Sequence, residues 1–238
     1  MKSPFCTSAG LFLLLSVAIA NAQCPGISSA ITFFPVSGAP FTAEYIHTFD
    51  PINRDGTRNH QEAHGQIYRD SEGRGRCDVR NLKTGAIRLV VIRDPVARLT
   101  ISMNPEKQTA TVTHHTPVSP DEPRQNKAAK PAVEVHSLNS THSEEELPSE
   151  TIEGFMVTGK RYINTDLAGQ TSTMEDWYSP DLKYNLRSAW NSQSGGSSSD
   201  KVINIRKGDP DPSVFQVPEG FTVKNLYCRG SVCNYDSE

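Results

Sequence analysis

Apolar and polar residues alternate along most of the chain after residue 40, a pattern that predicts β-strands. The clearest run covers residues 97–103, whose odd positions are all apolar: Ala97, Leu99, Ile101 and Met103. A second run at residues 109–113 follows the Asn-Pro-Glu-Lys sequence of 104–107, which favours a type I turn because proline restricts φ. Together the two runs predict a β-hairpin.

Further alternating or β-branched runs predict the other strands. They cover residues 41–49, 61–69, 74–80, 87–92, 150–164, 171–178, 182–190 and 201–206, and the Ser- and Gly-rich residues 192–200 are expected to form a flexible hairpin loop. A helical turn is expected after Asp211, a suitable N-cap, with Pro212 at the first position. About ten strands joined by short turns predict a mainly β fold: a curved antiparallel meander sheet or half-barrel, with little helix beyond the signal peptide.

The first 22 residues have the layout of a secretory signal peptide. Lys2 supplies the positive end, residues 11–20 form an apolar core, and Ala20-Asn21-Ala22 is a small-x-small cleavage site. The apolar core is shorter than the ~20 residues needed to span a bilayer. We therefore expect an exported protein, periplasmic or extracellular, with no integral membrane span.

Composition along the chain predicts how the remaining residues are organised. Residues 23–40 are expected to be a flexible leader, residues 41–227 a single β domain, and residues 228–238 a cysteine-bearing tail. Residues 114–149 contain five prolines, no aromatic residue and the acidic run Glu144-Glu145-Glu146, so they are expected to be a disordered insert. A linker between two domains is the competing interpretation, but neither half shows a self-sufficient core.

Charge excludes some classes of partner. Without residues 1–22 the chain keeps 23 basic residues against 27 acidic ones, because Lys2 is the only charge removed from the 24 Lys and Arg residues. Nucleic-acid binding requires a basic excess, and adhesion to anionic lipid requires a polybasic patch. We expect no nucleic-acid partner, and the open possibilities are an apolar small molecule or an envelope protein.

Four cysteines, Cys24, Cys77, Cys228 and Cys233, follow the expected cleavage site. Four cysteines allow three pairings, and export to an oxidising compartment permits disulfides. Cys228 and Cys233 are close in sequence with Gly230 between them, so a disulfide joining these two is favoured. Gln23 replaces the small residue that a lipidation signal requires before the cysteine, so Cys24 is interpreted as unlipidated.

Candidate chemistry is sparse in this sequence. Nucleophile and metalloprotease motifs are absent, and the aspartates mostly neighbour proline or glycine, where turn chemistry explains them. His60 and His64 would lie ~13 Å apart on a strand, too far to share a metal ion. We therefore predict no catalytic residues, no metal site, no cofactor and a protein that is not an enzyme.

Aromatic residues give the remaining hint, and they suggest a ligand. Residues Trp177, Tyr184, Leu186 and Trp190 are predicted to line a ligand site on the concave face of the sheet. Aromatic residues clustered in this way more often simply form the core. The leading hypothesis is an exported cell-envelope protein that binds a lipid-like or other apolar ligand. The alternatives are an interaction or sensing module that uses the acidic insert, and an envelope hydrolase.

Several stretches are similar to a set of uncharacterised exported proteins of Acidobacteria-type bacteria. The matching segments are residues 40–44, 65–74 (Gly-Gln-Ile-Tyr-Arg-Asp-Ser-Glu-Gly-Arg), 92–95, 151–154, 177–182 (Trp-Tyr-Ser-Pro-Asp-Leu), 208–212 (Gly-Asp-Pro-Asp-Pro) and 215–218. That likeness implies no particular activity, and the insert and the cysteine-bearing tail lie outside it. More distantly, the succession of strands resembles the periplasmic lipoprotein-carrier fold, which implies an open, curved antiparallel sheet that holds acyl chains.

Overall fold

The computed structural model describes residues 36–53, 55–81, 83–116, 141–229 and 232–235. In these residues the strands are β1 (Phe41–Pro51), β2 (Gln61–Arg69), β3 (Gly75–Arg80), β4 (Ile87–Asp94), β5 (Leu99–Asn104), β6 (Thr109–Thr116), β7 (Thr141–Ile152), β8 (Phe155–Thr165), β9 (Thr171–Ser179), β10 (Tyr184–Ser192), β11 (Gly196–Lys207), β12 (Thr222–Arg229) and β13 (Val232–Tyr235). A single 3₁₀ turn, η1 (Pro212–Phe215), stands between β11 and β12. The predicted signal peptide and most of the predicted leader lie outside the described residues.

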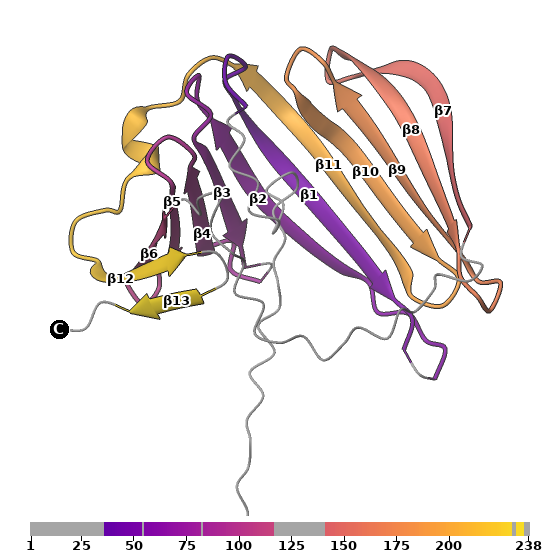
Figure 1. Cartoon of the computed structure of the whole chain (residues 1–238), viewed down its shortest axis with the longest axis horizontal. Helices are drawn as coiled ribbons and strands as arrows, with labels where there is room; N and C mark the ends of the chain where they lie inside the picture. Colours follow the sequence, from indigo (N-terminus) through magenta and orange to yellow (C-terminus); the bar gives the residue numbers. More distant parts are fainter. Residues whose placement is uncertain (1–35, 54, 82, 117–140, 230–231, 236–238) are drawn as a thin grey trace, which may run out of the picture.

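All thirteen strands belong to one sheet, in the order β13-β12-β6-β5-β4-β3-β2-β1-β11-β10-β9-β8-β7. Two meanders, β1 to β6 and β7 to β11, meet where β1 pairs with β11. Every neighbouring pair is antiparallel except β6 with β12, which is parallel because the η1 connection crosses back to the β6 edge. Figure 1 shows this single layer, with β7 and β13 at its two ends. The mainly β, curved antiparallel sheet predicted above is confirmed, with more strands than expected.

The first core cluster lies on the face of the sheet that carries Phe41, here named the Phe41 face. Its buried residues are Phe41, Ala43, Tyr45, Ile67, Cys77, Val79, Val157, Leu182, Leu186 and Val202. The Phe41 and Tyr184 rings are 5.3 Å apart, although β11 separates their strands. Arg69 of β2 reaches further still and donates a hydrogen bond to the backbone oxygen of Leu182. The sheet therefore curls toward the Phe41 face, as large twisted sheets do.

The second core cluster lies on the opposite face, named the Val90 face. Its buried residues are Val90, Ile92, Ile101, Met103, Ala110 and Phe215, the last contributed by η1. The change of face occurs at β3, where Cys77, Asp78 and Val79 are all buried. Buried Asp78 accepts a 2.6 Å hydrogen bond from Arg76 Nε, and Arg76 also donates to the Val214 backbone oxygen. Arg76 thus pairs with Asp78 within β3 and links this strand to η1, which contributes Phe215 to the second cluster.

Local signals in the sequence located several elements correctly. The hairpin of β5 and β6 is confirmed, and so is the helical turn with Asp211 as its N-cap. The predicted disulfide between Cys228 and Cys233 is also confirmed, and it joins residues directly opposite each other in β12 and β13. No helix among the described residues combines the length and apolar character that a membrane crossing requires.

The predicted disordered insert at residues 114–149 was wrong at both ends. Strand β6 continues to Thr116 and β7 begins at Thr141, so only residues 117–140 lie outside the described part. The acidic run is ordered because β8 supplies matching cations: Glu144 lies 3.2 Å from Lys160, and Glu145 lies 2.9 Å from Arg161. β7 is an edge strand with a mostly exposed surface, so it needs little apolar sequence.

The expected loop at residues 192–200 was also wrong in extent. Strand β11 begins at Gly196, and its serines pair with β1 and β10. Gly196 has φ +96°, and a Cβ there would lie 2.1 Å from the Asp50 backbone oxygen, so this residue must be glycine. A polar strand formed where composition suggested a loop. Pairing with strands on both sides gives hydrogen-bond partners to its backbone N–H and C=O groups.

Candidate functional site

Register places an apolar strip across the Phe41 face, at the end of the sheet remote from the first cluster. Residues directly opposite on neighbouring strands share a face. Following the pairs from β1 to β8 gives one continuous line, named here the aromatic row: Phe49, Ser198, Trp190, Met174 and Tyr162. These residues come from five adjacent strands, so the aromatic row is about 19 Å long at ~4.8 Å per strand.

The aromatic row differs from the core in its exposure. Met174 is 41% exposed, and Phe49, Trp190 and Tyr162 are only partly buried. Leu186, farther along β10, is in contrast completely buried in the first cluster. The row is therefore apolar surface that the described residues leave accessible.

A line of polar residues, the polar row, lies between the aromatic row and the first cluster on the same face. Its members, in strand order from β1 to β8, are His47, Asp200, Ser188, Asp176 and Lys160. His47 Nδ1 lies 2.7 Å from Asp200 Oδ1, and this hydrogen bond raises the pKa of His47 above its usual value. The Ser188 hydroxyl donates a 2.6 Å hydrogen bond to Asp176. Polar groups therefore border the apolar strip on its inner side.

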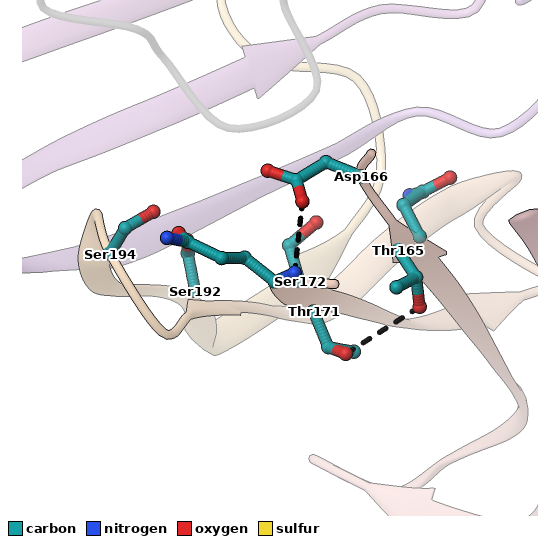
Figure 2. A pocket seen from close by; sticks show the side chains of 8 residues that line it. Thr165, Asp166, Thr171, Ser172, Ser192 and Ser194 are labelled. Atoms are coloured by element: carbon teal, nitrogen blue, oxygen red, sulfur yellow. Dashed lines mark hydrogen bonds between the residues drawn. The ribbon is translucent and has the colours of Figure 1, made fainter. Parts of the chain in front are cut away.

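A small pocket of about 190 Å³ lies at the outer end of this face. Its lining residues are Asn164, Thr165, Asp166, Gln170, Thr171, Ser172, Ser192 and Ser194, and Figure 2 shows how they lie. Ser192 pairs with Ser172, and Ser172 with Asn164, so the pocket continues the Phe41 face beyond the aromatic row. Asp166 accepts 2.9 Å hydrogen bonds from the backbone N–H groups of Ala168 and Gln170, which explains it as a turn residue.

On the Val90 face, most residues that alternate with the two rows are polar. Thr48 and Ser199 hydroxyls are 2.7 Å apart, and Arg161 lies between two carboxylates, 2.7 Å from Glu175 and 2.9 Å from Glu145. These side chains alternate along their strands with members of the aromatic and polar rows. The apolar strip therefore belongs to one face of this half of the sheet.

The four residues predicted to bind a ligand occupy different places. Trp190 is part of the aromatic row, whereas Leu186 and Tyr184 pack in or against the first cluster. Trp177 lies opposite Arg187, next to the register shift between Asn185 and Arg187, and it packs against the first cluster with the Arg187 guanidinium 3.8 Å from the centre of its ring. The structure thus brings three of the four to the core, and ligand contact by the set stays a prediction.

Phe49, Met174 and Tyr162 were not among the predicted site residues. Each is a single apolar position in a strand of mixed composition, and nothing local distinguishes it from a core position. Only the pairing of β1 with β11 and of β8 with β9 brings them into line with Trp190. The useful signal was the parity of Phe49 with Phe41 and Tyr45, which places these three residues on one face.

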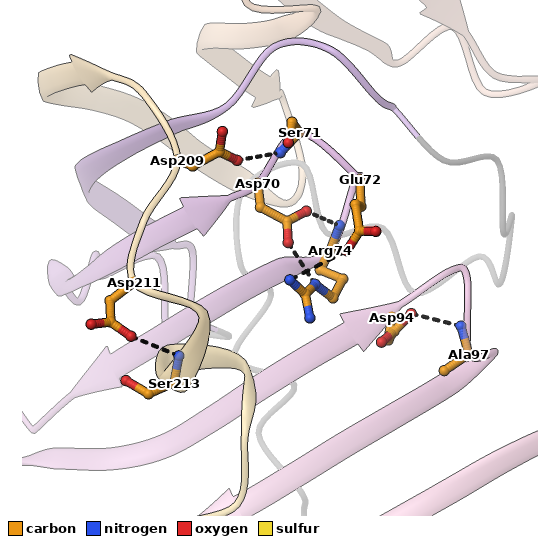
Figure 3. Close-up of polar contacts among 9 residues, drawn as sticks. All are labelled: Asp70, Ser71, Glu72, Arg74, Asp94, Ala97, Asp209, Asp211 and Ser213. Carbon is orange, nitrogen blue, oxygen red and sulfur yellow. Dashed lines mark hydrogen bonds and ion pairs between the residues drawn. The ribbon is translucent and has the colours of Figure 1, made fainter.

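Asp94 and Asp211 serve local backbone groups at turns, as predicted, whereas Asp209 binds a backbone group that is distant in sequence. Asp94 accepts a 2.7 Å hydrogen bond from Ala97 N–H, and Asp211 a 2.8 Å bond from Ser213 N–H (Figure 3). Figure 3 also shows Asp70 bound to Arg74, with Asp209 accepting from the backbone N–H of Ser71. Across the part of the chain that the structure describes, His, Cys, Asp and Glu side chains form no group of three or more suited to a metal ion.

Sequence comparisons return nothing: no family profile and no curated protein matches this chain. The structure is similar to MucB in its complex with MucA from Pseudomonas aeruginosa, with 14% identity, a TM-score of 0.43, and 75% of this chain matching 56% of that one. It is also similar to a LolA-superfamily protein from Nitrosomonas europaea, with 9% identity, a TM-score of 0.38, and coverage of 74% and 90%. The lipoprotein LppX of Mycobacterium tuberculosis follows at 10% identity, a TM-score of 0.32, and coverage of 76% and 91%.

The chain thus spans about half the length of MucB. All three TM-scores lie below 0.5, so these likenesses assign neither a family nor a function. They include the lipoprotein-carrier class to which the sequence bears its distant resemblance. The resemblance to Acidobacteria-type exported proteins finds no support among the sequence comparisons and stays a prediction.

Proposed function

We propose that this protein is an exported, non-enzymatic binding protein that holds a lipid-like ligand on the Phe41 face, along the aromatic row. The observation that carries the proposal is a line of partly exposed apolar side chains that register places side by side across five adjacent strands. Large accessible apolar strips on soluble domains mark binding surfaces. The signal-peptide layout of residues 1–22 supports a periplasmic or extracellular location.

The dimensions of the aromatic row suit a hydrocarbon chain. A strip about 19 Å long and one side chain wide fits an extended alkyl chain better than a compact molecule. Each CH₂ group removed from water contributes about 0.8 kcal/mol. Covering half of a twelve-carbon chain therefore contributes roughly 5 kcal/mol, before the cost of ordering the ligand.

The engagement of the aspartates near the turns supports binding over catalysis. A hydrolase with two acidic groups needs carboxylates poised in a cleft. The aspartates of Figure 3 are instead engaged with backbone N–H groups and arginine. The docking role suggested for the acidic insert concerns residues 117–140, outside the described part, and it stays a prediction.

Replacing Trp190 by alanine tests the proposal. Trp190 is the central aromatic residue of the row, so its loss should weaken binding of a neutral dodecyl probe, such as dodecyl maltoside, about tenfold, equivalent to ~1.4 kcal/mol. Isothermal titration below the critical micelle concentration gives the dissociation constant. The control is Tyr235→Ala, which removes an exposed aromatic ring from β13 at the far edge of the sheet. Equal affinities for the two folded variants would contradict the proposal.

A further inference from the structure

Two carboxylates on the Phe41 face stand beside the aromatic row. Asp200 is two residues from Ser198 on β11, and Asp176 is two residues from Met174 on β9, so each lies about 6.6 Å along its strand from the row. Both are directly opposite Ser188 of β10, one on each side. They therefore border the part of the row that contains Trp190.

The cation placed opposite Asp176 does not neutralise it. Lys160 pairs with Asp176 in register, but its Nζ lies 3.2 Å from Glu144 and 3.4 Å from Glu146, on the β7 side. The hydrogen bond of Asp176 in the described structure is to the Ser188 hydroxyl, which carries no charge. The carboxylate is partly buried, so its charge is less screened than that of a fully exposed group.

The rest of the polar row adds to this negative charge. Asp200 is hydrogen-bonded to His47, and this bond raises the pKa of His47; a protonated His47 balances one negative charge. Glu144, which lies opposite Tyr162 at the β7 end of the row, shares Lys160 with Glu146. Carboxylates therefore outnumber cations beside the aromatic row, in a sheet face that otherwise offers apolar surface and hydroxyl groups.

We infer that the ligand of this face is a cationic amphiphile: its amine or ammonium group lies between Asp176 and Asp200 against Trp190, and its alkyl chain follows the aromatic row. Opposite charge attracts such a group, and the face of an indole ring binds cations as well. An anionic headgroup would be repelled by the same carboxylates. This inference rests on the proposed function and adds the charge of the ligand to it.

Three probes that share a twelve-carbon chain test the inference on the purified protein. They are dodecyltrimethylammonium, dodecyl maltoside and dodecanoate, each titrated below its critical micelle concentration. The ammonium probe should bind at least tenfold more tightly than dodecanoate at low salt. The ratio should shrink at high salt, because screening weakens the charge term.

Two matched variants test whether Asp176 causes the preference for the ammonium probe. Asp176→Asn keeps the shape and a hydrogen-bond acceptor for Ser188 and should remove most of the preference for ammonium. Glu175→Gln makes the same change of charge at the adjacent residue, on the Val90 face beside Arg161, and should leave the preference unchanged. If Asp176→Asn does not fold, the ratio and its salt dependence in the unmodified protein decide the question.

The outcomes separate the two proposals. If the three probes bind equally, if dodecanoate binds most tightly, or if folded Asp176→Asn keeps the full preference, the inference about charge is overturned while the proposed function stands. If none of the three probes binds, the proposed function itself fails. A preference for ammonium that disappears in Asp176→Asn alone supports both.

Discussion

Replacing Phe41 by alanine should lower the free energy of unfolding by about 4 kcal/mol, the typical cost of removing a buried phenylalanine ring. Phe41 is fully buried where β1 meets the rest of the sheet. Its ring packs edge-on against Tyr184 at 5.3 Å and lies 4.8 Å from the buried Arg69 guanidinium. The variant leaves a cavity and uncovers a cation whose hydrogen bonds go to backbone oxygens of Ala39 and Leu182. Urea unfolding followed by circular dichroism measures the change.

Phe49→Ala is the matched control because Phe49 lies on the same strand and the same face but is partly exposed. We expect it to cost about 1 kcal/mol or less, since less apolar area returns to water. Similar losses of stability in the two variants would show that the aromatic row is packed as tightly as the first cluster, which contradicts its assignment as accessible surface.

Gly65→Ala should cost about 3 kcal/mol, because the methyl group has no room. A Cβ at Gly65 would lie 1.9 Å from the Asp78 backbone oxygen and 2.3 Å from Tyr45 Cε1. The ring of Tyr45, itself fully buried with its pKa raised to about 12 by burial, lies over the strand at this residue. To make room for the new methyl group, β2 and β3 would have to separate or Tyr45 would have to leave the core. Thermal unfolding by calorimetry is the measurement.

Gly75→Ala provides the comparison in the neighbouring strand. There the nearest atom to a new Cβ is the Tyr68 backbone oxygen, 4.0 Å away, so the change should stay within about 1 kcal/mol. A Gly65→Ala variant that unfolds at the same temperature as Gly75→Ala would show that β1, β2 and β3 do not pack as described.

The elements that could be predicted from the sequence are those with local causes. The β5–β6 hairpin follows from two alternating runs around a Pro-containing turn, and η1 from Asp211 and Pro212. The disulfide of Cys228 with Cys233 follows from their closeness in sequence. In each case the residues that decide the structure lie within a few positions of one another, so pattern and turn chemistry suffice.

The elements that could not be predicted depend on partners distant in sequence. β7 is acidic and almost free of apolar residues, and it is a strand because Lys160 and Arg161 of β8 lie beside its glutamates. The aromatic row depends on pairs such as Thr48 with Ser199, 151 positions apart, which no local signal specifies. A shift of one residue in that register would turn Phe49 to the other face. This sensitivity explains why only Trp190 of the predicted ligand residues lies in the row.

The central claim, that a lipid-like chain lies along the aromatic row, is tested most directly by photo-cross-linking. A dodecyltrimethylammonium analogue with a diazirine near the end of its chain would be irradiated with the protein, and the modified residues identified by mass spectrometry of peptides. We predict adducts at Phe49, Tyr162, Met174 and Trp190, which unlabelled dodecyltrimethylammonium suppresses. Adducts confined to the Val90 face, for example at the exposed Val223 and Tyr227 of β12, would contradict the account.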